Sequence, residues 1–152
     1  MPEKDLYLED FTPGDTYEFG QYEVTESEII EFASKYDPQP FHLDHEAAKA
    51  THFGGLVASG WHTCAMTMRM LIDEMMLFGN SLGSPGVDKI RWLRPVRPDD
   101  VLTARGTVKE VRPSRSRPEM GSVSFGYEVL NQKNEVVMTM QAISLFKRRS
   151  KT

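Results

Sequence analysis

The clearest hydrophobic pattern in the chain lies between residues 59 and 76, where apolar side chains recur at spacings of three, four and seven. This spacing predicts an α-helix that begins at Ser59 or Gly60. Its other faces are also rich in methionine, threonine and alanine, and a helix that is apolar on most sides is usually buried on most sides. We therefore expect a long, buried helix. The recurring positions are Trp61, Cys64, Ala65, Met68, Leu71, Ile72, Met75 and Met76.

Five other runs favour β-strands, because they alternate or are rich in β-branched and aromatic side chains. They are residues 17–24, 87–93, 101–111, 121–130 and 136–147. One strand, then helices, then an antiparallel meander is the element order of an α+β protein. The economical packing is a single domain over residues 1–152, in which a curved antiparallel sheet wraps around the long central helix.

Two shorter helices are predicted between the first strand and the long helix. Thr25 and Glu28 have the spacing of a capping box, with Thr25 as the N-cap. The helix that they open should stop before Asp37, because Pro38 follows. A second helix is expected from about Asp44 to Ala50, with Asp44 as its N-cap.

Charge and composition narrow the function classes. The net charge of −4 argues against a nucleic-acid-binding surface, which is normally basic. The single cysteine excludes an internal disulfide and fits a reducing compartment, so we expect a cytoplasmic protein. No signal peptide is apparent at the N-terminus. The longest apolar stretch is interrupted by Arg69, Asp73 and Glu74, so no membrane span is expected.

A rigid polar segment follows the first predicted helix, where residues 36–44 read Tyr-Asp-Pro-Gln-Pro-Phe-His-Leu-Asp. Each proline fixes its own φ and biases the residue before it away from the helix, so Asp37 and Gln39 should be extended. From such a loop, Asp37 and His42 can converge on one water molecule. Polar groups held on a stiff loop beside a core are what a proton-transfer site requires.

A second signal lies at the start of the long helix, where Ala58, Ser59 and Gly60 form a turn of small residues. A helix N-terminus offers free N–H groups and a partial positive charge. It can therefore stabilise a carbonyl oxygen that becomes anionic. The residues leave an alternative open, in which Asp37 only ends its helix and His42 is a satisfied core histidine. An acid and an imidazole beside an oxyanion site nevertheless suit proton transfer.

These residues resemble those of the MaoC-like dehydratase family, which contains the R-specific enoyl-CoA hydratases and has a hot-dog fold. The family's hydratase motif runs as a small residue, Gly, Asp, any residue, Asn, Pro, an aliphatic residue and His. Asp37, Pro40 and His42 fall in register with it, and the spacing carries the family's oxyanion glycine onto Gly60. Residues 86–100 resemble the family's strand and the Pro-Val-x-x-Gly-Asp turn after it. The similarity covers nearly the whole chain.

The resemblance implies reversible hydration of a 2-enoyl thioester to a 3-hydroxyacyl thioester, the reaction of a hydro-lyase. Asp37 would take a proton from water, and His42 would hold that water and deliver a proton to the α-carbon. The Gly60 amide would stabilise the enolate-like state, while Gln39 and Ser59 would contact water or substrate. The thioester itself activates the alkene, so no cofactor and no metal are expected.

The chain departs from the family motif in ways that bear on the substrate. Tyr36 replaces the glycine before the acid, Gln39 replaces Asn, and Ser59 stands where many members carry His. Tyr36, Phe41 and Trp61 bring aromatic bulk to the motif. If these rings line the acyl pocket, they shorten it and favour short or branched acyl groups. The alternative is that they face away and fill the underside of the loop.

The expected partners are an acyl-CoA or acyl-carrier thioester and further copies of this chain. A lone five-stranded sheet leaves its edges exposed, and joining two sheets edge to edge covers one edge of each, so at least a homodimer is expected. Two other functions stay open: a hot-dog thioesterase that uses the acid to direct water at the carbonyl, and a non-catalytic acyl-thioester-binding module. His42, Asp44 and His45 lack the spacing of a zinc-binding helix.

Overall fold

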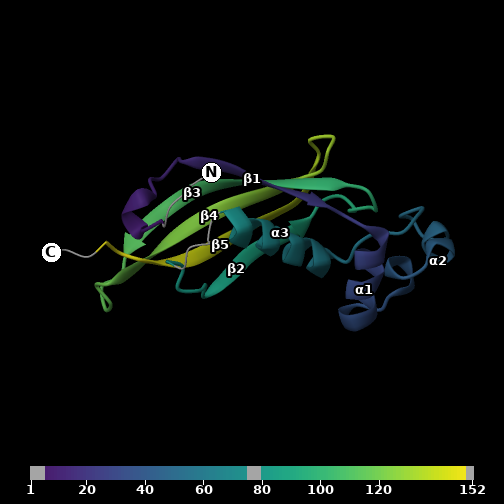
Figure 1. The fold of residues 1–152 in the computed structure, drawn as a ribbon, viewed down its shortest axis with the longest axis horizontal. Coiled ribbons are helices and arrows are strands. Elements are labelled where there is room, and N and C mark those ends of the chain that lie inside the picture. Colours follow the sequence, from purple (N-terminus) through teal and green to yellow (C-terminus); the bar gives the residue numbers. More distant parts are fainter. Residues whose placement is uncertain (1–5, 75–79, 150–152) are drawn as a thin grey trace.

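A computed structural model describes residues 6–74 and 80–149 of the chain. Over these residues, five strands form one antiparallel sheet in the order β1-β3-β4-β5-β2, as Figure 1 shows. The α+β hot-dog prediction is confirmed, and each predicted strand is present within a few residues of its expected ends. The strands are β1 (Thr16–Glu23), β2 (Gly86–Trp92), β3 (Val101–Pro113), β4 (Met120–Leu130) and β5 (Val136–Lys147).

Three helices accompany the sheet in the described part of the chain. In Figure 1, α3 lies along one face of the sheet, whereas α1 and α2 lie together beyond one of its ends. None of the described helices is both long and apolar enough to cross a lipid bilayer. The helices are α1 (Glu26–Tyr36), α2 (His45–Lys49) and α3 (Gly60–Glu74), with short 3-10 turns η1 (Leu8–Asp10) and η2 (Pro40–His42).

The sheet has one buried and one partly exposed face, because successive side chains of a strand point to opposite sides. Along β4, Val123, Phe125, Tyr127 and Val129 are buried, while the residues between them are less so. The buried side chains pack with α3 into one core. Its other large members include Phe19, Met66, Met70, Leu71, Leu102, Val108, Met138 and Phe146.

Helix α3 is less buried than its composition predicts. Met66, Met70 and Leu71 lie in the core, but Trp61 and Met68 are exposed. The buried stripe is therefore rotated relative to the expected one and includes the polar residues His62, Thr63 and Thr67. The expectation of burial on most sides is wrong for a single chain, because a sheet covers only the side of a helix that faces it. Met75 and Met76, also expected in this stripe, lie outside the described residues.

The helix starts follow the predicted capping, with one difference. Ser59 precedes α3, and Asp44 caps α2 by accepting a hydrogen bond from the Glu46 amide at 3.2 Å. Thr25 caps α1 by accepting from the Glu28 amide at 3.2 Å. The reciprocal half of the capping box does not form, because the Glu28 carboxylate turns toward other elements.

Candidate active site

The polar segment after α1 folds as a tight ordered loop. Asp37 is the C-cap of α1, and its amide donates to the Ala33 carbonyl at 2.9 Å. Pro38 cannot continue the helix ladder, since it has no N–H. Pro40 then opens the 3-10 turn that ends with His42, whose amide donates to the Gln39 carbonyl at 2.9 Å. The two prolines thus bring Asp37 and His42 to the same side of the loop.

The carboxylate of Asp37 and the imidazole of His42 are in contact. His42 Nε2 lies 3.3 Å from Asp37 Oδ2, and the two side chains are 7% and 18% exposed, respectively. On the other side of the ring, His42 Nδ1 lies 2.7 Å from the Val57 carbonyl oxygen. A carbonyl oxygen only accepts hydrogen bonds, so Nδ1 carries the proton. This contact leaves Nε2 free to face the carboxylate and to exchange a proton.

Asp37 is held by a donor on each carboxylate oxygen. The Ser59 hydroxyl donates to Oδ2 at 2.7 Å, and the Gln39 side-chain amide donates to Oδ1 at 2.7 Å. Burial alone would raise the pKa of Asp37, but these donors and the nearby His42 outweigh it and lower the pKa below its usual value. Asp37 is therefore a carboxylate that stays ionised in a partly buried place.

The first turn of α3 provides a backbone donor beside this pair. Ser59 caps the helix, because its Oγ accepts from the Trp61 amide at 3.3 Å. Gly60 is the first residue of the helix, so its N–H has no intrahelical acceptor. The ring of Trp92 lies over Gly60, and a Cβ at this position would lie 2.4 Å from Trp92 Cε2. A larger residue at this position would have to displace the indole.

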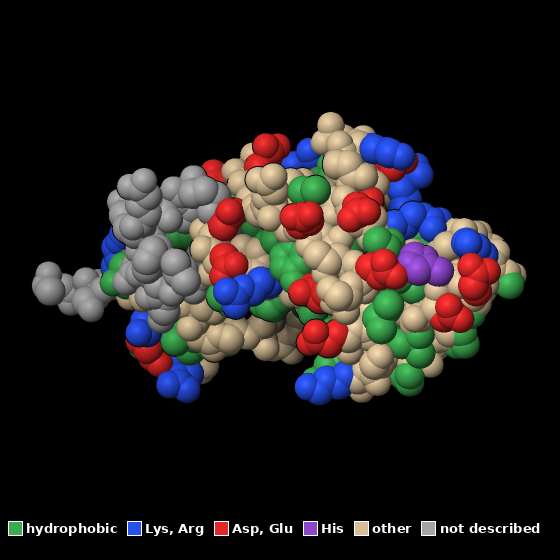
Figure 2. Space-filling view, turned by 45° about the vertical axis from the view of Figure 1, so that its right-hand side comes forward, with side chains coloured by type: hydrophobic (Ala, Val, Ile, Leu, Met, Phe, Trp, Pro, Cys, Tyr) green, Lys and Arg blue, Asp and Glu red, His purple; other side chains and the backbone are tan. Residues whose placement is uncertain are grey.

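These groups line one cavity of about 590 Å³ at the end of the sheet near α1 and α2. Figure 2 brings this end of the molecule forward and shows hydrophobic side chains exposed between acidic and basic ones. Most of the residues selected from the sequence meet in this cavity. They are Asp37, Gln39, Phe41, His42, Ser59, Gly60 and Trp61.

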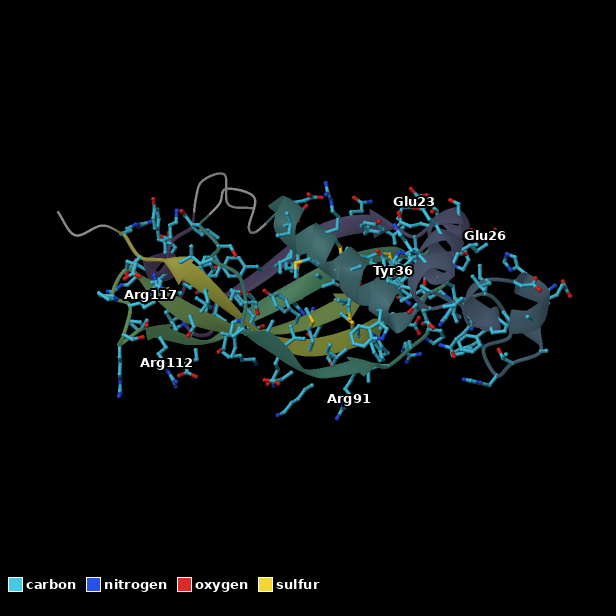
Figure 3. All side chains as sticks on the ribbon, turned by 90° about the horizontal axis from the view of Figure 1, so that it is seen from below. Glu23, Glu26, Tyr36, Arg91, Arg112 and Arg117 are labelled. Atoms are coloured by element: carbon cyan, nitrogen blue, oxygen red, sulfur yellow. The ribbon has the colours of Figure 1, made fainter. Side chains whose placement is uncertain are left out.

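Tyr36 is the exception among the selected residues. Its side chain is 67% exposed and lines a separate groove between α1 and α3 rather than the cavity. Tyr36 shares a face of α1 with Phe32, and the two ring centroids are 5.2 Å apart. Figure 3 labels it on α1. Because the chain turns immediately after it, Tyr36 points away from the cavity, and this placement does not support a role in the acyl pocket.

Val57 and Trp92 stand out among the cavity residues that were not identified from the sequence, because each contacts a candidate catalytic group. Val57 orients His42 through its backbone carbonyl, which no side-chain pattern reveals. Trp92 covers Gly60 from β2, far along the chain. A tryptophan near the end of a predicted strand was the available signal, but the residue that it contacts depends on how β2 packs. Figure 3 also shows Arg112 and Arg117 at the opposite end of the sheet, far from Tyr36.

Comparison with known proteins places this geometry in a family. The sequence profile described as MaoC like domain matches residues 10–141. The chain belongs to the MaoC-like dehydratase family. It is 31% identical over 131 residues to a 3-hydroxybutyryl-CoA dehydratase of Methylorubrum extorquens, covering 82% of this chain and 78% of that one. It is also 30% identical over 143 residues to the uncharacterised protein YdeM of Bacillus subtilis, covering 94% and 100%.

A solved structure of a MaoC-like dehydratase has the same fold as this chain. The MaoC-like dehydratase from Rhodospirillum rubrum superimposes with a TM-score of 0.89 at 41% sequence identity, covering 97% of this chain and 100% of that chain. The family contains hydratases and dehydratases, and the site described above lies inside the matched region.

Proposed function

We propose that this MaoC-like domain catalyses the reversible addition of water to a 2-enoyl thioester, giving a 3-hydroxyacyl thioester. The observation that carries the proposal is the contact between Asp37 and His42 beside the free amide of Gly60. A base, a proton donor and an oxyanion donor are the three groups that this reaction needs. The 3-hydroxybutyryl-CoA dehydratase among the relatives supports an acyl-CoA as the substrate.

In the hydration direction, Asp37 accepts a proton from water while the water oxygen bonds to the β-carbon of the substrate. The electron pair of the alkene moves toward the thioester, and the Gly60 amide stabilises the negative charge on its oxygen. Protonated Nε2 of His42 delivers a proton to the α-carbon. Transfer of the new proton from Asp37 to His42, across their 3.3 Å contact, restores the starting state. Atoms and charge balance without any further reactant.

Crotonyl-CoA tests the reaction type directly. Hydration removes the absorbance of the conjugated enoyl thioester without releasing a thiol, whereas a thioesterase releases free CoA. A binding module does neither, although it still binds the thioester in a calorimetric titration. We expect loss of enoyl absorbance and formation of 3-hydroxybutyryl-CoA. Thiol release in step with substrate loss would contradict the proposal.

The acyl pocket is proposed to favour short chains, because Phe41 and Trp61 both line the cavity. Each methylene that fits is worth about 0.8 kcal/mol of burial, so a series of acyl lengths reports the depth of the pocket. We expect kcat/KM to peak at short acyl-CoAs and Trp61→Ala to shift the peak to longer ones. Tyr36→Ala is the matched aromatic control and should leave the preference unchanged. Activity that rises steadily to long chains would contradict the proposal.

A homodimer formed through β2 is proposed as the active assembly. The β2 edge of the sheet exposes Val87 and Trp92, followed by exposed Leu93, and it also exposes charges of both signs on Asp88, Lys89 and Arg91. At the other edge, β1 exposes Glu18 and Glu23, which disfavour pairing with another strand. Since Trp92 also lines the cavity, pairing through β2 would bring the two cavities of a dimer close to the shared edge.

A further inference from the structure

A second hydrogen-bonded cluster joins α1 and α3 outside the cavity. His62, in the first turn of α3, has Nε2 3.2 Å from Oε1 of Glu28 on α1. The hydroxyl of Tyr22 on β1 donates to the same oxygen. The His62 ring also stacks on Phe32, with ring centroids 4.7 Å apart and planes inclined by 9°. The Glu28 carboxylate thus connects three elements, β1, α1 and α3.

The Glu28 carboxylate makes these contacts instead of a hydrogen bond to the start of its own helix. Glu28 stands where the capping box would use its carboxylate to bond back to the N-cap of α1. Its amide does donate to Thr25, but its carboxylate reaches Tyr22 and His62 instead. The start of α1 therefore has one of the two capping-box hydrogen bonds, and the Glu28 carboxylate bonds to His62 on α3 instead of forming the other.

Packing alone does not explain a histidine at position 62, because burying an imidazole costs free energy that an apolar ring would not cost. The residue is 3% exposed, and its Nδ1 is buried with no hydrogen-bond partner among the described residues. Burial lowers the pKa of His62, although Glu28 opposes the shift, so the ring is neutral and donates its Nε2 proton to Glu28. Its Nδ1 lone pair then stays unpaired, which buried polar groups rarely do. An apolar ring would fill the same space without this unpaired nitrogen.

The place of His62 in α3 suggests what its hydrogen bond does. The first turn of the helix is held on three sides: Ser59 bonds to Asp37, Trp92 lies over Gly60, and His62 bonds to Glu28. The Gly60 amide lies within this turn. Its direction therefore depends on all three contacts, and only the His62 contact lies outside the cavity.

We propose that His62 is a positioning residue for the site. Its hydrogen bond to Glu28 sets the orientation of the first turn of α3 against α1, and through that turn the direction of the Gly60 amide and the Ser59–Asp37 hydrogen bond. The catalytic consequence of this inference rests on the proposed hydratase function. The structural consequence does not.

His62→Phe is the decisive variant, because it keeps a buried ring stacked on Phe32 and removes both nitrogens. We expect the melting temperature to stay unchanged or rise, since the unpaired nitrogen is gone. KM for crotonyl-CoA should stay within about twofold, while kcat falls by about 10- to 100-fold, the loss expected from a small misplacement of a catalytic group. A fall in kcat that only accompanies a lower melting temperature would mean an ordinary structural role and would overturn the proposal.

Variants of Glu28 test the partner. Glu28→Ala should lower kcat as His62→Phe does, and the double variant should be no slower than the slower single variant. Glu28→Gln keeps an acceptor for the imidazole and should retain most activity. The matched control is His45→Phe, which breaks the exposed His45–Glu26 contact of 2.5 Å between α2 and α1. It should leave kcat unchanged.

Nuclear magnetic resonance separates this inference from the reaction itself. In His62→Phe, the amide cross-peak of Gly60 and the titration of the Asp37 carboxyl should shift, whereas in His45→Phe neither should. If wild-type protein consumes no enoyl thioester, the proposed function fails, and the Gly60 and Asp37 shifts still support the positioning role. If the Gly60 cross-peak, the Asp37 titration and kcat are all unchanged in His62→Phe, the positioning role is overturned.

Discussion

The Asp37 carboxylate accepts one hydrogen bond on each oxygen, from Gln39 and from Ser59, and contacts His42 on the Ser59 side. At the residue scale, this arrangement decides its chemistry. Burial raises the pKa of Asp37, but charge-assisted hydrogen bonds favour the ionised form and lower the pKa below its usual value. The Val57 carbonyl accepts a hydrogen bond from Nδ1 of His42 and so orients the ring with Nε2 toward Asp37. Each reacting group is therefore oriented by a neighbour that need not react.

Asp37→Asn and His42→Ala should each abolish most hydration while the protein stays folded. A positioned acid or base contributes about 10²- to 10⁴-fold, so kcat should fall by at least that order. Circular dichroism would verify the fold, and turnover of crotonyl-CoA would measure the loss. Near-wild-type turnover in both variants would show that this pair does not perform the proton transfers.

Ser59→Ala should shift the pH dependence of activity. The active form of Asp37 is ionised, and removing a donor raises its pKa. The acid limb of the kcat/KM profile should therefore move to higher pH. The free energy of unfolding should also depend on pH through Asp37. Because the pKa of Asp37 is lower in the folded protein than in the unfolded chain, its ionisation stabilises the fold above the unfolded pKa. This stabilisation is lost as pH falls through the folded pKa. The exposed Ser34→Ala on α1 is the control, and an acid limb that stays in place in both variants would contradict the argument.

At the scale of elements, α3 has one face in the core and another open. Its N-terminus is held by the Ser59 cap and by contacts to α1 and β2. Along the buried face, Leu71 is 4% exposed, while Met68 on the open face is 49% exposed. Most of what α3 contributes to the free energy of folding therefore comes from the side that packs against the sheet.

Leu71→Ala should destabilise the protein by about 2–5 kcal/mol, the usual cost of a cavity in a packed core. Met68→Ala removes a side chain of similar size from the open face and should change the free energy of unfolding by only about 0.5 kcal/mol in the monomer. Urea denaturation of both variants measures the difference. Equal costs would mean that Met68 is covered in solution, for instance by a second copy of the chain.

At the scale of the whole molecule, the two edges of the sheet differ. The β1 edge exposes Glu18 and Glu23, whereas the β2 edge exposes Val87 and Trp92 beside the cavity together with the charged Asp88, Lys89 and Arg91. Burial of apolar surface drives association, and acidic side chains on an edge resist it. We therefore expect two copies to meet at β2, where exposed apolar side chains lie beside the cavity.

Val87→Lys should weaken the proposed dimer, because it places a charge on the apolar edge. Sedimentation velocity should show a larger fraction of monomer than in wild type. Gln21→Lys, which adds the same charge to the opposite edge strand β1, should leave the dimer intact. A monomeric wild-type protein, or dissociation caused by both substitutions, would exclude assembly through β2.

Much of the local structure follows from residues that lie close together in the chain. Alternation placed the strands, capping residues placed the helix starts, and Pro38 and Pro40 brought Asp37 and His42 together, because these effects act between residues close in the chain. The resemblance to the MaoC-like family assigned the oxyanion glycine to Gly60, in the turn of small residues where the long helix was expected to begin. Apolar spacing alone misplaced the buried stripe of α3, since methionine and alanine are compatible with either side of a helix.

The way in which distant segments complete the site depends on the folded chain. It brought Ser59 to Asp37, Trp92 over Gly60 and His62 against Glu28, and it turned Tyr36 away from the cavity. Each of these contacts depends on the distance and rotation between packed elements. These distances and rotations are set by how the side chains of the whole core fit together. The spacing of residues within one segment therefore does not predict them.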